Sequence, residues 1–141
     1  MIYVDSSFLV AAYVVDVHSP AVVHRLWAEL HVGITPFGRS EVANTVFRQV
    51  FLKKLTPAEA NRAWQSFEAD CQGGTWDCME LPERAWETSV DLARKHVPRL
   101  GVRTLDTLHV ACALELKAKR FWTFDERQAR LAEAVGLNTS A

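Results

Sequence analysis

Short apolar runs and longer amphipathic segments alternate along the first part of the chain. Residues 2–4 favour a strand and end at 5–7, an Asp-Ser-Ser sequence in which each residue can cap a helix over 8–14. After a serine and a proline that suit a helix start, apolar residues recur at helical spacing up to His31. The pattern predicts a strand followed by two helices.

A second strand and a long helix are predicted next. The apolar run at 32–35 is interrupted by Pro36 and Gly38, and apolar residues at helical spacing then indicate a helix beginning near Arg39. Glu41 is therefore expected in the first turn of that helix.

The middle of the chain continues the alternation. Thr56-Pro57-Ala58-Glu59 has the form of a capping box, so a helix is predicted from there toward the glycines at 73–74. A third strand is expected at 76–81. The next helix follows Pro82 and is expected to stop at His96 and Pro98.

The last part of the chain predicts a buried helix, a strand and a closing helix. Residues 105–116 are apolar nearly all round, and Asp106 stands in their first turn. A fourth strand at 121–123 leads to Asp125, and the last helix covers 126–135.

Strands separated by helical segments indicate a parallel sheet, because parallel strands need crossover connections. The expected fold is α/β, a three-layer sandwich with a central, mainly parallel sheet of four to five strands flanked by helices. The chain has 141 residues, of which 49% are hydrophobic. One domain over 1–141 can bury a sufficient core at that size.

Charge and cysteine content narrow the class of protein. The net charge of -1 does not favour a polyanion partner for the whole molecule, so any RNA contact must be local. Three cysteines without a CxxC pair argue against a disulfide framework and a structural zinc. The first residues lack a basic region and reach an acid early, which predicts neither a signal peptide nor a membrane span. A cytoplasmic location is expected.

Four acidic residues occupy comparable places in the predicted elements. Asp5 and Asp125 lie at strand-to-helix junctions, while Glu41 and Asp106 lie in the first turns of helices. Ligands of open parallel sheets bind beyond the carboxyl ends of the strands, so the four carboxylates are expected to face one crevice. Crowded carboxylates repel one another unless a cation compensates. Oxygen ligands without nearby His or Cys suit magnesium or manganese better than zinc.

Simpler structural roles remain open for each acid on local context alone. Asp5 and Asp106 can be helix caps, Glu41 can interact with the helix dipole, and Asp125 can be a turn residue. His109, three residues after Asp106, can be considered as a general base, but its apolar neighbours favour core packing with a hydrogen bond.

Four ordered segments resemble the PIN-domain family, in particular the VapC-type toxins of toxin-antitoxin pairs. The likeness covers nearly the whole chain, with 103–136 the most specific part, while 56–78 carry no matching motif. The segments are Ile-Tyr-Val-Asp-Ser-Ser-Phe-Leu-Val-Ala at 2–11, Ser40-Glu41-Val42, Arg-Thr-Leu-Asp-Thr-Leu-His-Val-Ala-Cys-Ala at 103–113 and Phe-Trp-Thr-Phe-Asp-Glu-Arg at 121–127.

The resemblance implies a PIN-like endoribonuclease that uses Mg²⁺ or Mn²⁺ to cleave RNA by water attack on phosphorus, as the toxin of a toxin-antitoxin pair. It also implies a homodimer and a cognate antitoxin that covers the active site, with a toxin-antitoxin hetero-oligomer as an alternative assembly. The residues it assigns to metal binding and catalysis are Asp5, Glu41, Asp106 and Asp125, supported by the hydroxyls of Ser6 and Thr123.

Basic residues near these acids are candidates for RNA contacts. Arg39, Arg99 and Arg103 could bind phosphates beside the cleft, although an ordinary solvated face explains them equally well. The alternative function is a catalytically silent PIN-like module that binds RNA or protein. A phosphoacceptor enzyme of the haloacid-dehalogenase type is disfavoured, because it needs a second aspartate where Ser7 stands.

Overall fold

A computed structural model describes residues 1–27 and 31–139. Its strands form one sheet in the order β3-β2-β1-β4, and every pairing is parallel. The strands are β1 (Ile2–Val4), β2 (Val32–Ile34), β3 (Asp77–Cys78) and β4 (Arg120–Trp122). The predicted α/β fold with a mainly parallel sheet is confirmed, with four strands and with a third strand shorter than expected.

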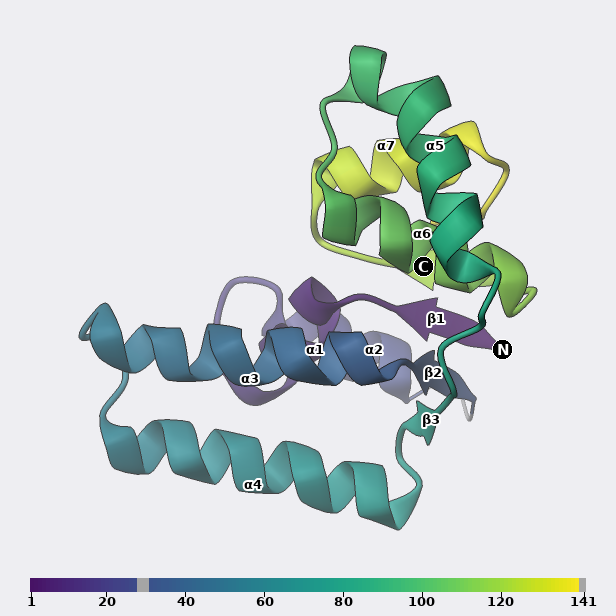
Figure 1. The fold of residues 1–141 in the computed structure, drawn as a ribbon. Coiled ribbons are helices and arrows are strands. Elements are labelled where there is room, and N and C mark those ends of the chain that lie inside the picture. Colours follow the sequence, from purple (N-terminus) through teal and green to yellow (C-terminus); the bar gives the residue numbers. More distant parts are fainter. Residues whose placement is uncertain (28–30, 140–141) are drawn as a thin grey trace.

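Seven helices of the described residues surround this sheet (Figure 1). Helices α3 and α4 lie side by side and extend away from the strands, while α5, α6 and α7 gather on the opposite side of β1. The helices are α1 (Ser6–Tyr13), α2 (Ser19–Leu26), α3 (Pro36–Phe51), α4 (Pro57–Gly73), α5 (Ala85–Leu100), α6 (Thr104–Glu115) and α7 (Glu126–Ala134). The predicted continuation of the second helix through 28–30 lies outside the described residues.

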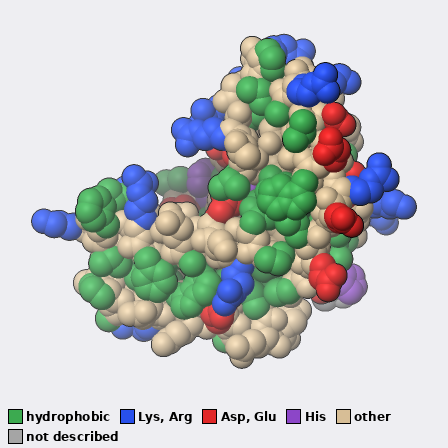
Figure 2. Space-filling model, in the orientation of Figure 1, with side chains coloured by type: hydrophobic (Ala, Val, Ile, Leu, Met, Phe, Trp, Pro, Cys, Tyr) green, Lys and Arg blue, Asp and Glu red, His purple; other side chains and the backbone are tan. Residues whose placement is uncertain are grey.

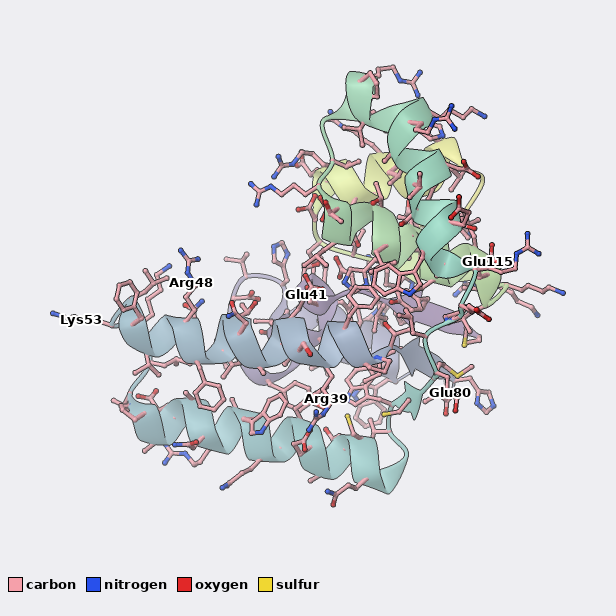
Figure 3. All side chains as sticks on the ribbon, viewed as in Figure 1. Arg39, Glu41, Arg48, Lys53, Glu80 and Glu115 are labelled. Atoms are coloured by element: carbon pink, nitrogen blue, oxygen red, sulfur yellow. The ribbon has the colours of Figure 1, made fainter. Side chains whose placement is uncertain are left out.

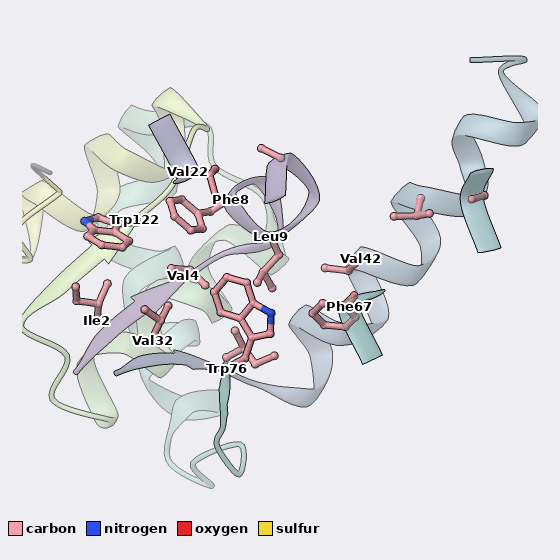
Figure 4. Packing of buried hydrophobic residues seen from close by; sticks show 14 residues of the cluster. Ile2, Val4, Phe8, Leu9, Val22, Val32, Val42, Phe67, Trp76 and Trp122 are labelled. Atoms are coloured by element: carbon pink, nitrogen blue, oxygen red, sulfur yellow. The ribbon is translucent and has the colours of Figure 1, made fainter. Parts of the chain in front are cut away.

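The alternation of side chains along the strands builds two cores, one on each face of the sheet. Ile2 and Val4 point into a cluster with residues of α1, α3 and α4, which Figure 4 shows around Trp76 and Phe67. Tyr3, between them in sequence, points into the second cluster with α5, α6 and α7. Successive strand residues face opposite sides, so one strand contributes to both layers.

Two helix boundaries differ from the sequence prediction. Helix α3 begins at Pro36 rather than near Arg39, because a proline at the first helical position gives up a backbone N–H that has no helical partner there. Glu41 therefore lies in the second turn, and its predicted place in the first turn is wrong. Helix α5 continues through Pro98 and ends at Gly101, whose φ of 63° is left-handed and whose N–H donates to the Val97 carbonyl at 2.8 Å.

The capping box of α4 is confirmed. The Thr56 hydroxyl accepts from the Glu59 backbone N–H at 3.2 Å, and the Glu59 carboxylate accepts from the Thr56 backbone N–H at 3.1 Å. Cysteines 71, 78 and 112 are free thiols. Within the described ranges, every helix is too short or too polar to cross a lipid bilayer.

Candidate active site

Asp5 is the most buried of the four predicted acids, with 1% of its surface exposed. It follows β1 directly and caps α1, where its Oδ1 accepts from the Phe8 backbone N–H at 3.0 Å. The same oxygen accepts from the Ser7 hydroxyl at 2.7 Å, and Oδ2 accepts from the Thr123 hydroxyl at 2.6 Å. Both carboxylate oxygens are therefore held in fixed directions.

Burial dominates the electrostatics of Asp5. Loss of water raises the pKa of this carboxyl, although the field of His109 and the donors on Ser7, Thr123 and Phe8 act in the opposite direction. Among the described residues, no ion pair reaches Asp5. The chain thus buries a carboxylate that a cation would stabilise.

Thr123 connects Asp5 to Asp125. Its hydroxyl donates to Asp5 and accepts from the Asp125 backbone N–H at 2.9 Å. Asp125 follows β4 and caps α7, where its Oδ1 accepts from the backbone N–H groups of Arg127 and Gln128 at 2.9 and 3.0 Å. Because β1 and β4 are neighbours in the sheet, the two aspartates that follow them come together at its carboxyl edge.

Gln128 links Asp125 to Asp106. Asp106 lies in the first turn of α6, where one oxygen accepts from the Arg103 backbone N–H at 2.8 Å. Its other oxygen accepts from the Gln128 side-chain amide at 3.0 Å. Helix α6 leads into β4 through a short turn, so its first residues lie at the same edge of the sheet as the end of β4.

Glu41 reaches the site from α3 through His109. Its Oε2 is hydrogen-bonded to Nε2 of His109, which is buried on α6 three residues after Asp106. Figure 3 shows Glu41 on the side of α3 that faces α6 and α7, whereas Arg39 points to α4. The Glu41 side chain is 22% exposed, so it can still be reached from solvent.

Two hollows lie beside Asp125 and Glu41 and share Thr45 in their lining. One, of about 360 Å³, is lined by Ser6, Thr45 and Asp125 among others. The other, of about 430 Å³, is lined by Phe37, Ser40, Glu41, Asn44, Thr45 and Leu105. Asp125 therefore borders the first hollow and Glu41 the second.

The donor atoms of the site suit a divalent cation in their chemistry. Carboxylate and hydroxyl oxygens are the ligands that Mg²⁺ and Mn²⁺ prefer, and the buried charge of Asp5 favours such an ion. Within residues 1–27 and 31–139, however, no three His, Cys, Asp or Glu side chains are gathered closely enough to hold a metal. The chemistry of the site fits the ion, while the carboxylates are linked through Thr123, Gln128 and His109 rather than by a shared ligand position.

The supporting residues differ in part from those expected. Thr123, one of the two predicted supporting residues, donates its hydroxyl hydrogen bond to Asp5, and so does Ser7, which was not predicted. Ser6, the other predicted residue, lines the hollow beside Asp125. Gln128 was missed, although Asp125-x-x-Gln128 has the spacing of a capping box. The sequence pattern did not indicate that Tyr3 contacts His109, because Tyr3 resembles an ordinary strand residue.

The predicted basic residues differ in their exposure and in their contacts. Arg103 is exposed immediately before α6, and Arg99 is exposed in the last turn of α5. Arg39 instead forms a bidentate pair with Glu68 at 2.7 and 2.8 Å and lies over the Trp64 ring. Arg48, seven residues after Glu41, is on the same face of α3 as that acid and is exposed (Figure 3).

Known proteins share this architecture. The fold is similar to VapC20 from Mycobacterium tuberculosis, a Sarcin-Ricin loop cleaving toxin, with a TM-score of 0.75 and 18% identity over 99% of this chain and 98% of that one. It is similar to FitAcB from Neisseria gonorrhoeae at a TM-score of 0.74 and 14% identity, covering 100% and 97% of the two chains. VapBC2 from Rickettsia felis, solved with a promoter DNA fragment, gives 0.69 and 16%, covering 99% and 98%.

Sequence comparison supports the same relationship. Curated proteins give no match. The family comparison matches residues 2–134, which include all four acids and all four strands, to the PIN domain. Since this match spans nearly the whole chain, the protein belongs to the PIN domain family.

Proposed function

We propose that this protein is a metal-dependent endoribonuclease and the toxin of a toxin-antitoxin pair. The observation that carries the proposal is the chain of hydrogen bonds at the carboxyl edge of the sheet. It joins Asp5 to Asp125 through Thr123, and Asp125 to Asp106 through Gln128. A structural role would require only helix caps, whereas these three aspartates are also linked to one another, and Asp125 borders an open hollow.

The carboxylates of the site have complementary roles. Asp5, Glu41, Asp106 and Asp125 would hold Mg²⁺ or Mn²⁺, and as a set they would have to approach one another more closely than in this structure. When bound, the ion supplies a Lewis acid for a phosphoryl oxygen and lowers the pKa of a bound water. Asp5 is fixed by Ser7 and Thr123, so it offers its negative charge without reorganisation. The carboxylates also accept hydrogen bonds from the attacking water and orient it toward phosphorus.

Cleavage assays test this function directly. Purified protein would be incubated with tRNA, mRNA and rRNA in Mg²⁺, Mn²⁺ or EDTA, beside the variants Asp5→Asn and Asp125→Asn. We expect cleavage only with a divalent ion and a loss on the order of 100-fold or more in both variants. Asp91→Asn, an exposed carboxylate on α5, is the matched control and should cleave normally.

Binding of RNA without cleavage in either metal would contradict the enzyme and support the alternative of a silent PIN-like binding module. Equal cleavage by the wild type and Asp5→Asn would show that a contaminating nuclease acts. These outcomes separate the two functions because binding and cleavage are measured on the same RNA.

An antitoxin partner and a homodimer form the second part of the proposal. Similar folds come from a toxin-antitoxin complex of Klebsiella pneumoniae and from VapBC2. Exposed apolar side chains lie toward the end of α3, where Phe51 is 83% exposed and Phe47 and Leu52 are also exposed (Figure 2). A surface of this kind favours contact with a protein.

Two measurements test these partners. Light scattering should give twice 15.9 kDa for the chain alone. The product of a neighbouring reading frame should copurify with the chain and inhibit cleavage.

A further inference from the structure

A buried polar chain connects the sheet to Glu41. The Thr35 hydroxyl lies 3.0 Å from the Tyr3 hydroxyl, which lies 3.0 Å from Nδ1 of His109, whose Nε2 is hydrogen-bonded to Glu41. Thr35, Tyr3 and His109 are each at most 2% exposed. These residues come from β1, the end of β2, α3 and α6, so four elements meet at one imidazole.

The direction of the last hydrogen bond follows from the donors available. An ionised Glu41 carboxylate only accepts, so the proton of this bond belongs to Nε2 of His109 whether the imidazole is neutral or charged. In the neutral form, with the proton on Nε2, Nδ1 accepts from the Tyr3 hydroxyl. Thr35 can then donate to the Tyr3 oxygen.

The ring of His109 is also fixed by packing. The Phe37 ring lies 4.3 Å from it between centroids, and the Tyr3 ring lies 5.8 Å away in an edge-on arrangement. Gly38 passes close to the ring, since a Cβ at that position would lie 3.6 Å from Cε1 of His109. With both nitrogens hydrogen-bonded and with Phe37, Tyr3 and Gly38 packed around the ring, the imidazole has little freedom to turn.

We propose that His109 is the positioning residue of Glu41. Its Nε2–H holds Oε2 of the carboxylate, which leaves Oε1 as the oxygen that binds the divalent cation. The inference rests on the proposed function, because it assigns a partner to one of the proposed ligands. Hydrogen-bonded partners of this kind fix the orientation and basicity of a metal ligand.

Two substitutions distinguish positioning from core filling. His109→Leu preserves an apolar volume but removes the donor, whereas His109→Gln retains an amide N–H about as far from the backbone as Nε2. A purely structural role predicts that both variants bind Mn²⁺ like the wild type once they are folded. A positioning role predicts that His109→Leu binds Mn²⁺ more weakly than the wild type and that His109→Gln restores the affinity. His96→Leu is the matched control, because His96 is a second buried histidine that lies on α5.

The experiment measures Mn²⁺ affinity by calorimetry on folded protein, followed by kcat and KM for RNA. We expect His109→Leu to bind Mn²⁺ about 10- to 100-fold more weakly, with kcat reduced and KM for RNA little changed. His109→Gln and His96→Leu should stay close to the wild type. Wild-type affinity in His109→Leu would overturn the inference while leaving the nuclease intact.

Nuclear magnetic resonance provides a readout without activity and a safeguard if His109→Leu does not fold. The Nε2 proton of His109 should be protected from exchange in the wild type and lose this protection in Glu41→Ala. Unchanged protection in Glu41→Ala would overturn the inference. A wild type that neither binds Mn²⁺ nor cleaves RNA would instead overturn the proposed function, and the inference with it.

Discussion

Asp5 places a carboxylate where water cannot solvate it. Its pKa is raised above the ordinary value of 3.8 because burial outweighs the hydrogen bonds that it accepts. An acid with a raised pKa in the folded state binds its proton more tightly there than in the unfolded chain. Stability therefore falls as the pH rises from the unfolded pKa through the folded one, and the cost persists at neutral pH.

Asp5→Asn should consequently lower the activity and raise the stability of the fold. In EDTA at neutral pH, we expect a higher melting temperature for Asp5→Asn than for the wild type, because the variant buries no charge. The difference should shrink as the pH falls toward the region where Asp5 is protonated in both states. Calorimetry at several pH values measures this, with Asp91→Asn as the exposed control. A lower melting temperature in Asp5→Asn would show that the hydrogen bonds outweigh the burial.

Local rules identified some site residues and could not identify others. Asp5 and Asp125 were predictable because each ends a strand and caps the helix that follows. The contact of Tyr3 with His109 joins residues 106 positions apart, and no local pattern encodes such a distance. The sequence therefore indicated that His109 would be buried with a hydrogen bond, but not that Glu41 would be its partner.

Prolines have opposite consequences in two of the helices, and this explains both boundary errors. Pro36 starts α3 because the first helical position needs no backbone donor, and Pro98 is tolerated in α5 because it lies in the last turn before Gly101. Reading each proline as a stop made both helices too short. Where proline was read as a starting residue, as in the capping box of α4, the boundary was correct.

The capping box of α4 offers a test confined to one element. Thr56→Ala should lower the free energy of unfolding by about 1 kcal/mol, because the Glu59 backbone N–H loses its acceptor. For a domain of this size that corresponds to roughly 4 °C in melting temperature. Thr56→Ser retains the hydroxyl and should stay close to the wild type. Equal losses in both variants would mean that the threonine methyl, not the cap, stabilises the helix start.

The whole molecule is a single sheet between two cores, and its class followed from the alternation of strands and helices. The alternation of strands and helices does not determine the order of the strands in the sheet. That order depends on the crossover connections, which place β1 between β2 and β4. The short length of β3 was not predictable either. A strand-favouring sequence indicates propensity, but it does not show over how many residues a neighbouring strand can pair with it. The expected convergence of four acids depended on that order.

Metal binding should stabilise the entire fold. A cation that binds only the folded chain adds about 2.7 kcal/mol to the free energy of unfolding at 100 times its dissociation constant. We expect Mn²⁺ to raise the melting temperature of the wild type and to have little effect on Asp5→Asn. Differential scanning calorimetry with and without added Mn²⁺, in buffer otherwise free of divalent ions, measures this difference in melting temperature. An equal rise in both proteins would indicate binding elsewhere on the surface.

The pairing of β1 with β4 also determines when the site around Asp5 can form during translation. Asp5 emerges from the ribosome before the other three acids, yet Thr123, which holds it, is made 118 residues later. A nascent chain lacks the fourth strand until residue 122 has been made, so Asp5 cannot be held beside Asp125 before then. The proposed ribonuclease would thus remain inactive until these residues have been translated.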